Sequence, residues 1–221
     1  MLAAVIGIPW VCFYVWCLTR GHMQKYRKYA PVKDAVYALL GYLGTMAACQ
    51  DLQGNPVICV AGAVLTGIML SVSAREDLHT GQFYVLPLMI CLLANLVIAG
   101  VCGRLWGEGS MDGVPLYQEA AVVAITITVL IFGRLAPGDG FIYLACWLSF
   151  RILLPDASFP AYLALLFISA ILGILTWVAR VLRGRSAGER FPFTAQIASG
   201  CLVTYLLSGF FVAAGIGRQV Y

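Results

Sequence analysis

Residues 116–154 read LYQEAAVVAITITVLIFGRLAPGDGFIYLACWLSFRILL, which is two long apolar runs joined by a short polar turn. The runs extend from Leu116 to Gly133 and from Phe141 to Leu154, and the turn contains Arg134 and Asp139. The hydrocarbon core of a bilayer, roughly 30 Å thick, needs about 20 apolar residues per helix, and about 17 can suffice. The stretch therefore predicts two membrane helices that meet at a polar turn.

The composition extends this prediction to the whole chain. Of its 221 residues, 62% are hydrophobic and 11% are charged, whereas a soluble domain has about 25% charged residues. Only helices and closed barrels satisfy the backbone inside lipid, and barrel strands alternate in hydrophobicity. Because the apolar runs here are continuous, we expect an all-α, polytopic membrane helix bundle. The net charge of +4 is small, so the composition does not indicate nucleic-acid binding.

Eight apolar runs predict eight transmembrane helices. We find no internal repeat, low-complexity tract or linker, so residues 1–221 are interpreted as a single transmembrane domain. A signal peptide would have a basic region before its apolar part. The first run has none, so it is interpreted as a retained helix. The predicted helices are Met1–Thr19, Ala35–Gln50, Val57–Ala74, Gln82–Cys102, Leu116–Gly133, Phe141–Leu154, Phe159–Val181 and Phe193–Gly217.

The basic residues predict the orientation of these helices. Eleven of the 14 Lys and Arg residues fall on one side of the predicted bundle, mainly in the segments 20–33 and 180–190. The other three are Arg104, Arg151 and Arg218. By the positive-inside rule the richer side faces the cytoplasm. Arg151 lies near the outer end of its helix, where a long side chain can extend to the interface.

Two carboxylates are predicted to lie at the same cytoplasmic depth. Asp77 follows the third apolar run and Asp139 precedes the sixth. Two close carboxylates do not both ionise easily, so such a pair shares a proton. One member can then act as general base on water and the other as general acid on a scissile amide. We expect Pro137 and Gly138 to hold Asp139 out of regular helix, since glycine permits unusual dihedral angles.

The same residues have simpler interpretations. Asp139 can cap the helix that follows it, where its carboxylate would meet free N–H groups. Asp77 can be a solvated residue paired with Arg75, and Glu76 competes with it for the role of first carboxylate. The eight cysteines include no CxxC pair, and neither HExxH nor GxSxG is present. The sequence therefore predicts no metal and no organic cofactor.

Three motifs in order resemble the type IV prepilin peptidases, membrane aspartic proteases that share a GxGD motif with presenilin-like enzymes. Segment 74–78 (AREDL) resembles the first aspartate segment of that family. Segment 137–145 (PGDGFIYLA) resembles the second, and segment 191–195 (FPFTA) resembles its C-terminal helix entry. The likeness covers the chain from about Val57 onward. Where the family usually reads GxGDxK, this sequence has Ala136 and Phe141 in place of the first glycine and the lysine.

This resemblance implies an aspartic endopeptidase of the prokaryotic plasma membrane, with Asp77 and Asp139 as the catalytic pair and Gly138 supporting the second aspartate. Its substrates would be prepilin-like proteins, each with a short basic leader before an apolar helix. Cleavage would fall between leader and helix, at the cytoplasmic face. Segment 20–33 is short and lacks cysteine, so the zinc domain of many bacterial members, and the methyltransferase activity linked to it, are not expected.

Two other functions compete with this interpretation. Carboxylates within membranes often relay protons, so an ion-coupled transporter is one alternative. Carriers, however, place their sites near the middle of the membrane and often at repeats. The other alternative is a non-catalytic membrane assembly factor, whose function would survive replacement of either aspartate by asparagine.

Overall fold

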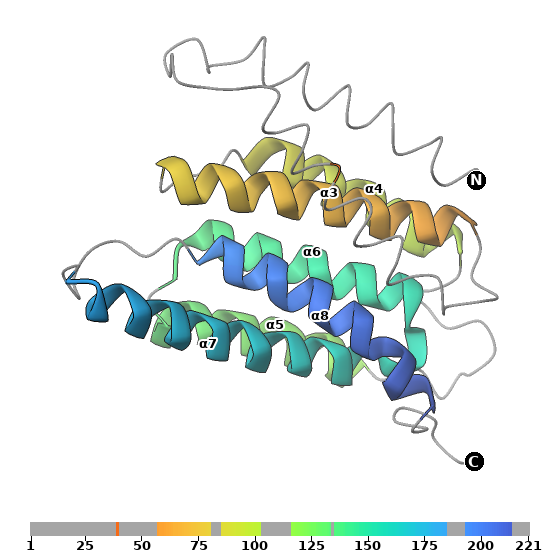
Figure 1. Ribbon diagram of the computed structural model, residues 1–221. Coiled ribbons are helices and arrows are strands. Elements are labelled where there is room, and N and C mark those ends of the chain that lie inside the picture. The colour runs from red at the N-terminus through yellow and green to blue at the C-terminus, as the bar shows by residue number, and fades with distance from the viewer. Residues whose placement is uncertain are drawn as a thin grey trace, which may run out of the picture.

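The computed structural model describes residues 39, 57–80, 85–102, 116–133, 135–184 and 193–213. This part of the chain is helical and contains no strand (Figure 1). The predicted helices Met1–Thr19 and Ala35–Gln50 lie outside the described residues, apart from Leu39. The elements are α3 (Val57–Thr80), α4 (Val85–Val101), α5 (Leu116–Gly133), α6 (Pro137–Leu153), the 3₁₀ helix η2 (Pro155–Ala157), α7 (Ser158–Leu182) and α8 (Thr194–Ala213).

The two helix ends next to the carboxylates differ from the prediction by several residues. Helix α3 continues beyond Ala74 to Thr80, so Asp77 lies within the helix. No Gly or Pro interrupts this segment, and Arg and Glu are good helix formers. Helix α6 begins at Pro137, four residues before the predicted Phe141. Proline suits the first helical position because its fixed φ is already helical. The expectation that Pro137 and Gly138 keep Asp139 out of regular helix was therefore wrong.

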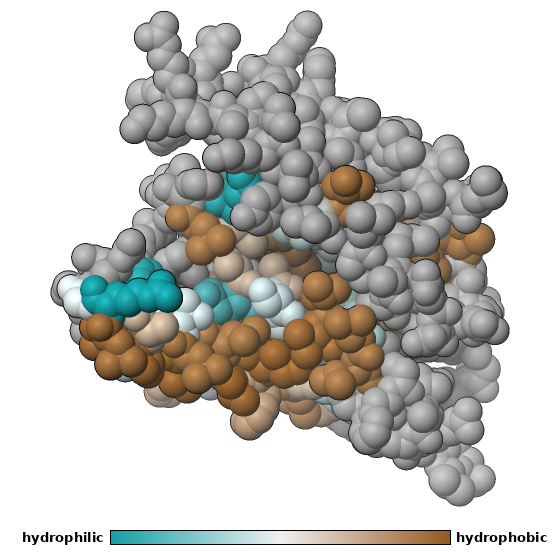
Figure 2. Space-filling view, viewed as in Figure 1, coloured by the Kyte–Doolittle hydropathy of each residue, from teal (hydrophilic) through white to brown (hydrophobic). Residues whose placement is uncertain are grey.

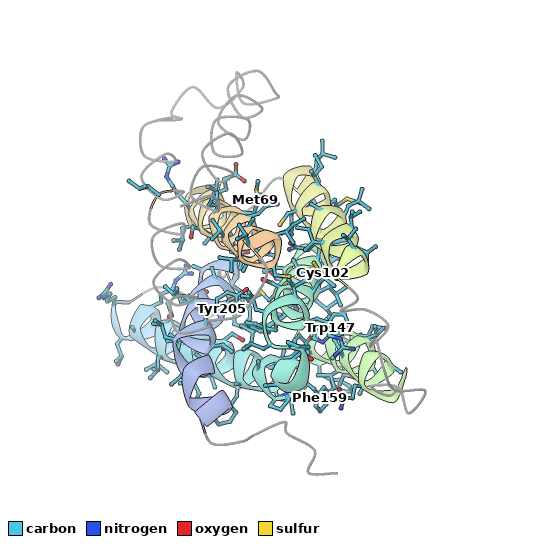
Figure 3. All side chains as sticks on the ribbon, turned by 90° about the vertical axis from the view of Figure 1, so that its right-hand side faces the viewer. Met69, Cys102, Trp147, Phe159 and Tyr205 are labelled. Atoms are coloured by element: carbon cyan, nitrogen blue, oxygen red, sulfur yellow. The ribbon has the colours of Figure 1, made fainter. Side chains whose placement is uncertain are left out.

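Helix α6 is the centre of the bundle. It contacts each of the five other α-helices from α3 to α8 that the structure describes, and most of its side chains are buried. In Figure 1, α3 and α4 form one layer, α6 and α8 the next, and α5 and α7 the third. Figure 3 views the bundle from the end of α6 opposite its start, with Tyr205 among the packed side chains. Because α6 is central, its first turn lies close to the ends of several other helices.

The outer surface of the described bundle is strongly apolar. Along α7, large side chains including Phe167, Ile174, Leu175 and Leu182 are exposed, and Figure 2 shows this apolar surface. Two described helices are long and apolar enough to cross a membrane, Val57–Leu78 and Ser158–Leu182. The first is 72% buried within the bundle and the second only 28%. Shorter apolar helices cover Leu88–Val101, Ala120–Gly133 and Thr194–Leu207.

Buried hydrogen bonds between side chains tie neighbouring helices together. Each joins a hydroxyl or amide on one helix to a hydroxyl on another, which gives these buried polar groups a partner across the helix interface. Such bonds inside membranes contribute about 0.6 kcal/mol each on average. The pairs are Thr66–Asn95 between α3 and α4, Thr126–Tyr162 between α5 and α7, Tyr143–Ser169 between α6 and α7, and Ser149–Tyr205 between α6 and α8.

The sequence suggested that Arg151 extends toward the surface, but the structure places it inside the bundle. It is 3% exposed, and its Nη1 donates to the carbonyl oxygen of Pro155 at 3.2 Å. The Ser158 hydroxyl donates to the same carbonyl at 3.2 Å. The guanidinium thus satisfies a carbonyl at the corner between α6 and α7, and this replaces the interfacial position that we expected.

The contact between Gly62 and Asn95 gives a prediction about α3–α4 packing. A Cβ at Gly62 would lie 2.7 Å from Oδ1 of Asn95, whose Nδ2 is held by Thr66 at 2.6 Å. We expect Gly62→Ala to destabilise the protein by about 1–3 kcal/mol through overpacking. Thermal unfolding in detergent measures this. The double variant Gly62→Ala/Asn95→Ala no longer has this clash, so its loss of stability should be smaller than the sum of the losses in the two single variants. If the loss in the double variant equals that sum, Gly62 and Asn95 are not in contact.

Candidate active site

Asp77 occupies the last turn of α3. Its side chain is 7% exposed, and the two charged residues before it, Arg75 and Glu76, are also buried. Charged side chains are almost never fully buried unless they have partners. The interpretation of Asp77 as a solvated residue is therefore wrong. Three consecutive buried charges make this end of α3 unlike the rest of the helix.

Asp139 is the third residue of α6 and is 5% exposed. Its Oδ2 accepts a hydrogen bond from the backbone N–H of Ala136 at 3.1 Å, and its own N–H donates to the Ala136 carbonyl at 2.9 Å. This reciprocal pair closes the first turn. The capping interpretation of Asp139 is thus confirmed for one oxygen, and Oδ1 of the same carboxylate faces a different partner.

Thr194 connects the two aspartates. It begins α8 and is fully buried. Its backbone N–H donates to Oδ2 of Asp77 at 3.1 Å, and its hydroxyl donates to Oδ1 of Asp139 at 3.3 Å. Residues separated by 117 and 55 positions in the chain therefore meet at one point. Asp77 and Asp139 form one site with Thr194 between them.

Helix ends contribute to the electrostatics of this site. The first N–H groups of a helix have no partner within it, and the helix dipole is positive there. Both α6 and α8 begin at the site, so each presents this end to a carboxylate. The starts of two helices, with their free N–H groups, therefore meet at the two carboxylates. The basic residues Arg75, Arg180 and Arg183 lie near the C-terminal ends of α3 and α7. Figure 1 shows these two helix ends on the same side of the bundle as the starts of α6 and α8.

Gly138 is the second residue of α6 and is half-buried. Among the described residues, a glycine with positive φ occurs only at Gly184, so Gly138 does not use the unusual dihedral angles that we expected. Gly140, on the other side of Asp139, has a clearer steric role. A Cβ there would lie 2.6 Å from Cδ1 of Leu130. The absence of a side chain at Gly140 lets α5 and α6 approach closely beside Asp139.

Sequence reasoning did not identify Thr194 as part of the site. The residue lies inside segment 191–195, which was noted only as a helix entry. A threonine directly after Pro192-Phe193, before an apolar run, is a signal for a helix start. That signal gives no indication that the hydroxyl reaches a carboxylate on another helix. Only the packing of α8 against α6 shows this.

Among the described residues, no group of three His, Cys, Asp or Glu side chains could hold a metal ion. The comparisons with known proteins give no relative for this chain. No protein-family model, no curated protein and no solved structure matches it. The function of this chain is therefore inferred from its own residues and their geometry.

The packing of Phe193 against Gly173 gives a prediction about the support of this site. A Cβ at Gly173 of α7 would lie 2.5 Å from Cε2 of Phe193, directly before Thr194. We expect Gly173→Ala to displace the ring and destabilise the protein by about 1–3 kcal/mol. Ala170→Val, on the exposed face of α7, is the control and should change stability by less than about 0.5 kcal/mol. Thermal unfolding of both variants checks this, and equal stabilities would contradict it.

Proposed function

We propose that this protein is a membrane-embedded aspartic endopeptidase that cleaves the leader peptide of prepilin-like proteins at the cytoplasmic membrane boundary. The observation that supports it best is the pair of hydrogen bonds from Thr194, one to Asp77 and one to Asp139. A dyad mechanism requires two carboxylates from distant parts of the chain to face one site. Burial of both groups also fits this chemistry, because burial disfavours two negative charges side by side and so favours a pair that shares one proton.

The reaction would be hydrolysis of a peptide bond. In the resting site the two carboxyl groups share one proton. The ionised member accepts a proton from water as the water oxygen attacks the scissile carbonyl carbon. The protonated member then donates to the amide nitrogen, and the C–N bond breaks. The two groups exchange protonation states during the cycle, so neither needs a metal or an organic cofactor.

The surroundings of the site agree with a substrate that enters from the membrane surface. In our proposal the eight predicted helices span a prokaryotic plasma membrane, with the site end in the cytoplasm. The exposed apolar surface of α7 supports a lipid environment. Arg75, Arg180 and Arg183 at the site end agree with the positive-inside rule. A prepilin-like substrate would place its apolar helix in lipid and its cleavage junction at the depth of Asp77 and Asp139.

Replacement of each aspartate by asparagine tests the proposal. Asparagine keeps the size of the side chain and one acceptor oxygen, so the contacts with Thr194 can persist, but it cannot cycle a proton. We expect Asp77→Asn and Asp139→Asn each to reduce cleavage at least about 1,000-fold, since proton transfer alone contributes about 10²–10⁴-fold. The assay follows the size shift of a prepilin-like protein, with a basic leader and a glycine before the junction, co-expressed in membranes.

Glu76→Gln is the matched control, because Glu76 is a buried carboxylate beside Asp77 on the same helix. All variants must be present at equal levels in the membrane. Cleavage that depends on both aspartates and survives Glu76→Gln supports the proposal. Cleavage that survives either aspartate variant contradicts the dyad. If the unaltered protein cleaves none of the prepilin-like substrates, the proposal fails, and a transporter or an assembly factor becomes the better hypothesis.

A further inference from the structure

Thr194 uses its hydroxyl differently from the other threonines whose hydroxyl bonds are defined. Those five lie inside helices, and each donates to the carbonyl four residues earlier in its own helix, a common local bond. Thr194 is the first residue of α8. Its hydroxyl reaches Asp139 on α6. The five local bonds are Thr66–Gly62, Thr126–Val122, Thr128–Ala124, Thr176–Leu172 and Thr204–Gly200.

The two donors of Thr194 also constrain the space between the carboxylates. Its N and Oγ1 atoms are separated by only three covalent bonds, through Cα and Cβ. The oxygens that accept from them, Oδ2 of Asp77 at 3.1 Å and Oδ1 of Asp139 at 3.3 Å, are therefore held on either side of one residue. A change in the position of Thr194 would move both hydrogen bonds together.

The start of α8 is itself fixed from α7. The ring of Phe193 fills the space over Gly173, and Nε2 of Gln196 donates to the Thr176 hydroxyl at 3.4 Å. These contacts flank Thr194 on both sides in the sequence. Thr194 consequently has little freedom to turn away from the carboxylates, as a positioning group requires.

We propose that Thr194 is a positioning residue of the aspartate pair, whose hydroxyl holds Asp139 in its reactive orientation and stabilises the ionised carboxylate. This inference rests on the proposed function and adds to it a residue outside the two aspartates. The backbone N–H of Thr194 holds Asp77 whatever the side chain is. The side chain acts on Asp139 alone, so the two contacts can be separated by substitution.

Thr194→Val removes the hydroxyl with little change in shape, and Thr194→Ser restores it. Hydrogen bonds to charged groups contribute about 1.5–3 kcal/mol, which corresponds to about 10- to 100-fold in rate. We expect Thr194→Val to lower kcat for leader cleavage by that factor with KM within about twofold, and Thr194→Ser to recover most of the rate. Thr204→Val, at an equally buried threonine of α8, is the control and should cleave at the unaltered rate.

A second measurement does not depend on cleavage. Dicyclohexylcarbodiimide reacts with protonated carboxyl groups in membranes, and mass spectrometry locates the adduct on Asp139 as the pH is varied. Loss of a donor to the carboxylate disfavours the ionised form, so in Thr194→Val labelling should persist to higher pH than in the unaltered protein or Thr204→Val. A labelling curve that is the same in all three proteins would overturn the inference, even if cleavage depends on both aspartates. If the labelling curve of Thr194→Val is shifted but the unaltered protein cleaves no prepilin-like substrate, the role of Thr194 is supported and the proposed substrate is not.

Discussion

Burial of Asp77 and Asp139 depends on hydrogen bonds that replace the water each carboxylate loses. A buried polar group without such partners costs several kcal/mol, and both side chains are less than one-tenth exposed. Thr194 supplies one donor to each, and Ala136 supplies a second to Asp139. These bonds form only when the end of α3 and the starts of α6 and α8 coincide. The two carboxylates therefore have their hydrogen-bond donors only when these three helices are correctly placed.

The rest of the bundle makes that coincidence possible. In the proposed lipid environment there is little hydrophobic drive for helices to associate, so packing and interhelical hydrogen bonds hold them together. Helix α6 is buried at the centre, and pairs such as Tyr143–Ser169 and Ser149–Tyr205 fix it against α7 and α8. Gly173 and Gly140 allow close approach beside the site. Small residues and buried hydroxyls thus place the start of each helix accurately at the site end.

Much of this arrangement could be predicted from the sequence, because continuous apolar runs define helices and polar turns separate them. Helix α5 has the predicted bounds, and the sequence alone indicates Asp77 and Asp139 as candidate residues because both lie where a polar turn meets an apolar run. Helix ends at charged residues were less predictable, since Arg75, Glu76 and Asp77 continue the helix that they were expected to end. The inward position of Arg151 and the role of Thr194 depend on contacts between distant segments. No local pattern carries that information.

Asp77 and Asp139 meet at one site through their hydrogen bonds with Thr194. The most direct test replaces both by cysteine and treats membranes with a short bifunctional thiol reagent, with mass spectrometry to detect the linked peptides. We predict a link between positions 77 and 139. The control places the first cysteine at position 78 instead of 77. Leu78 is the next residue of α3 and is 53% exposed, so no link to position 139 is expected. If each cysteine reacts singly with the reagent but 77 and 139 never become linked, the two aspartates do not form one site.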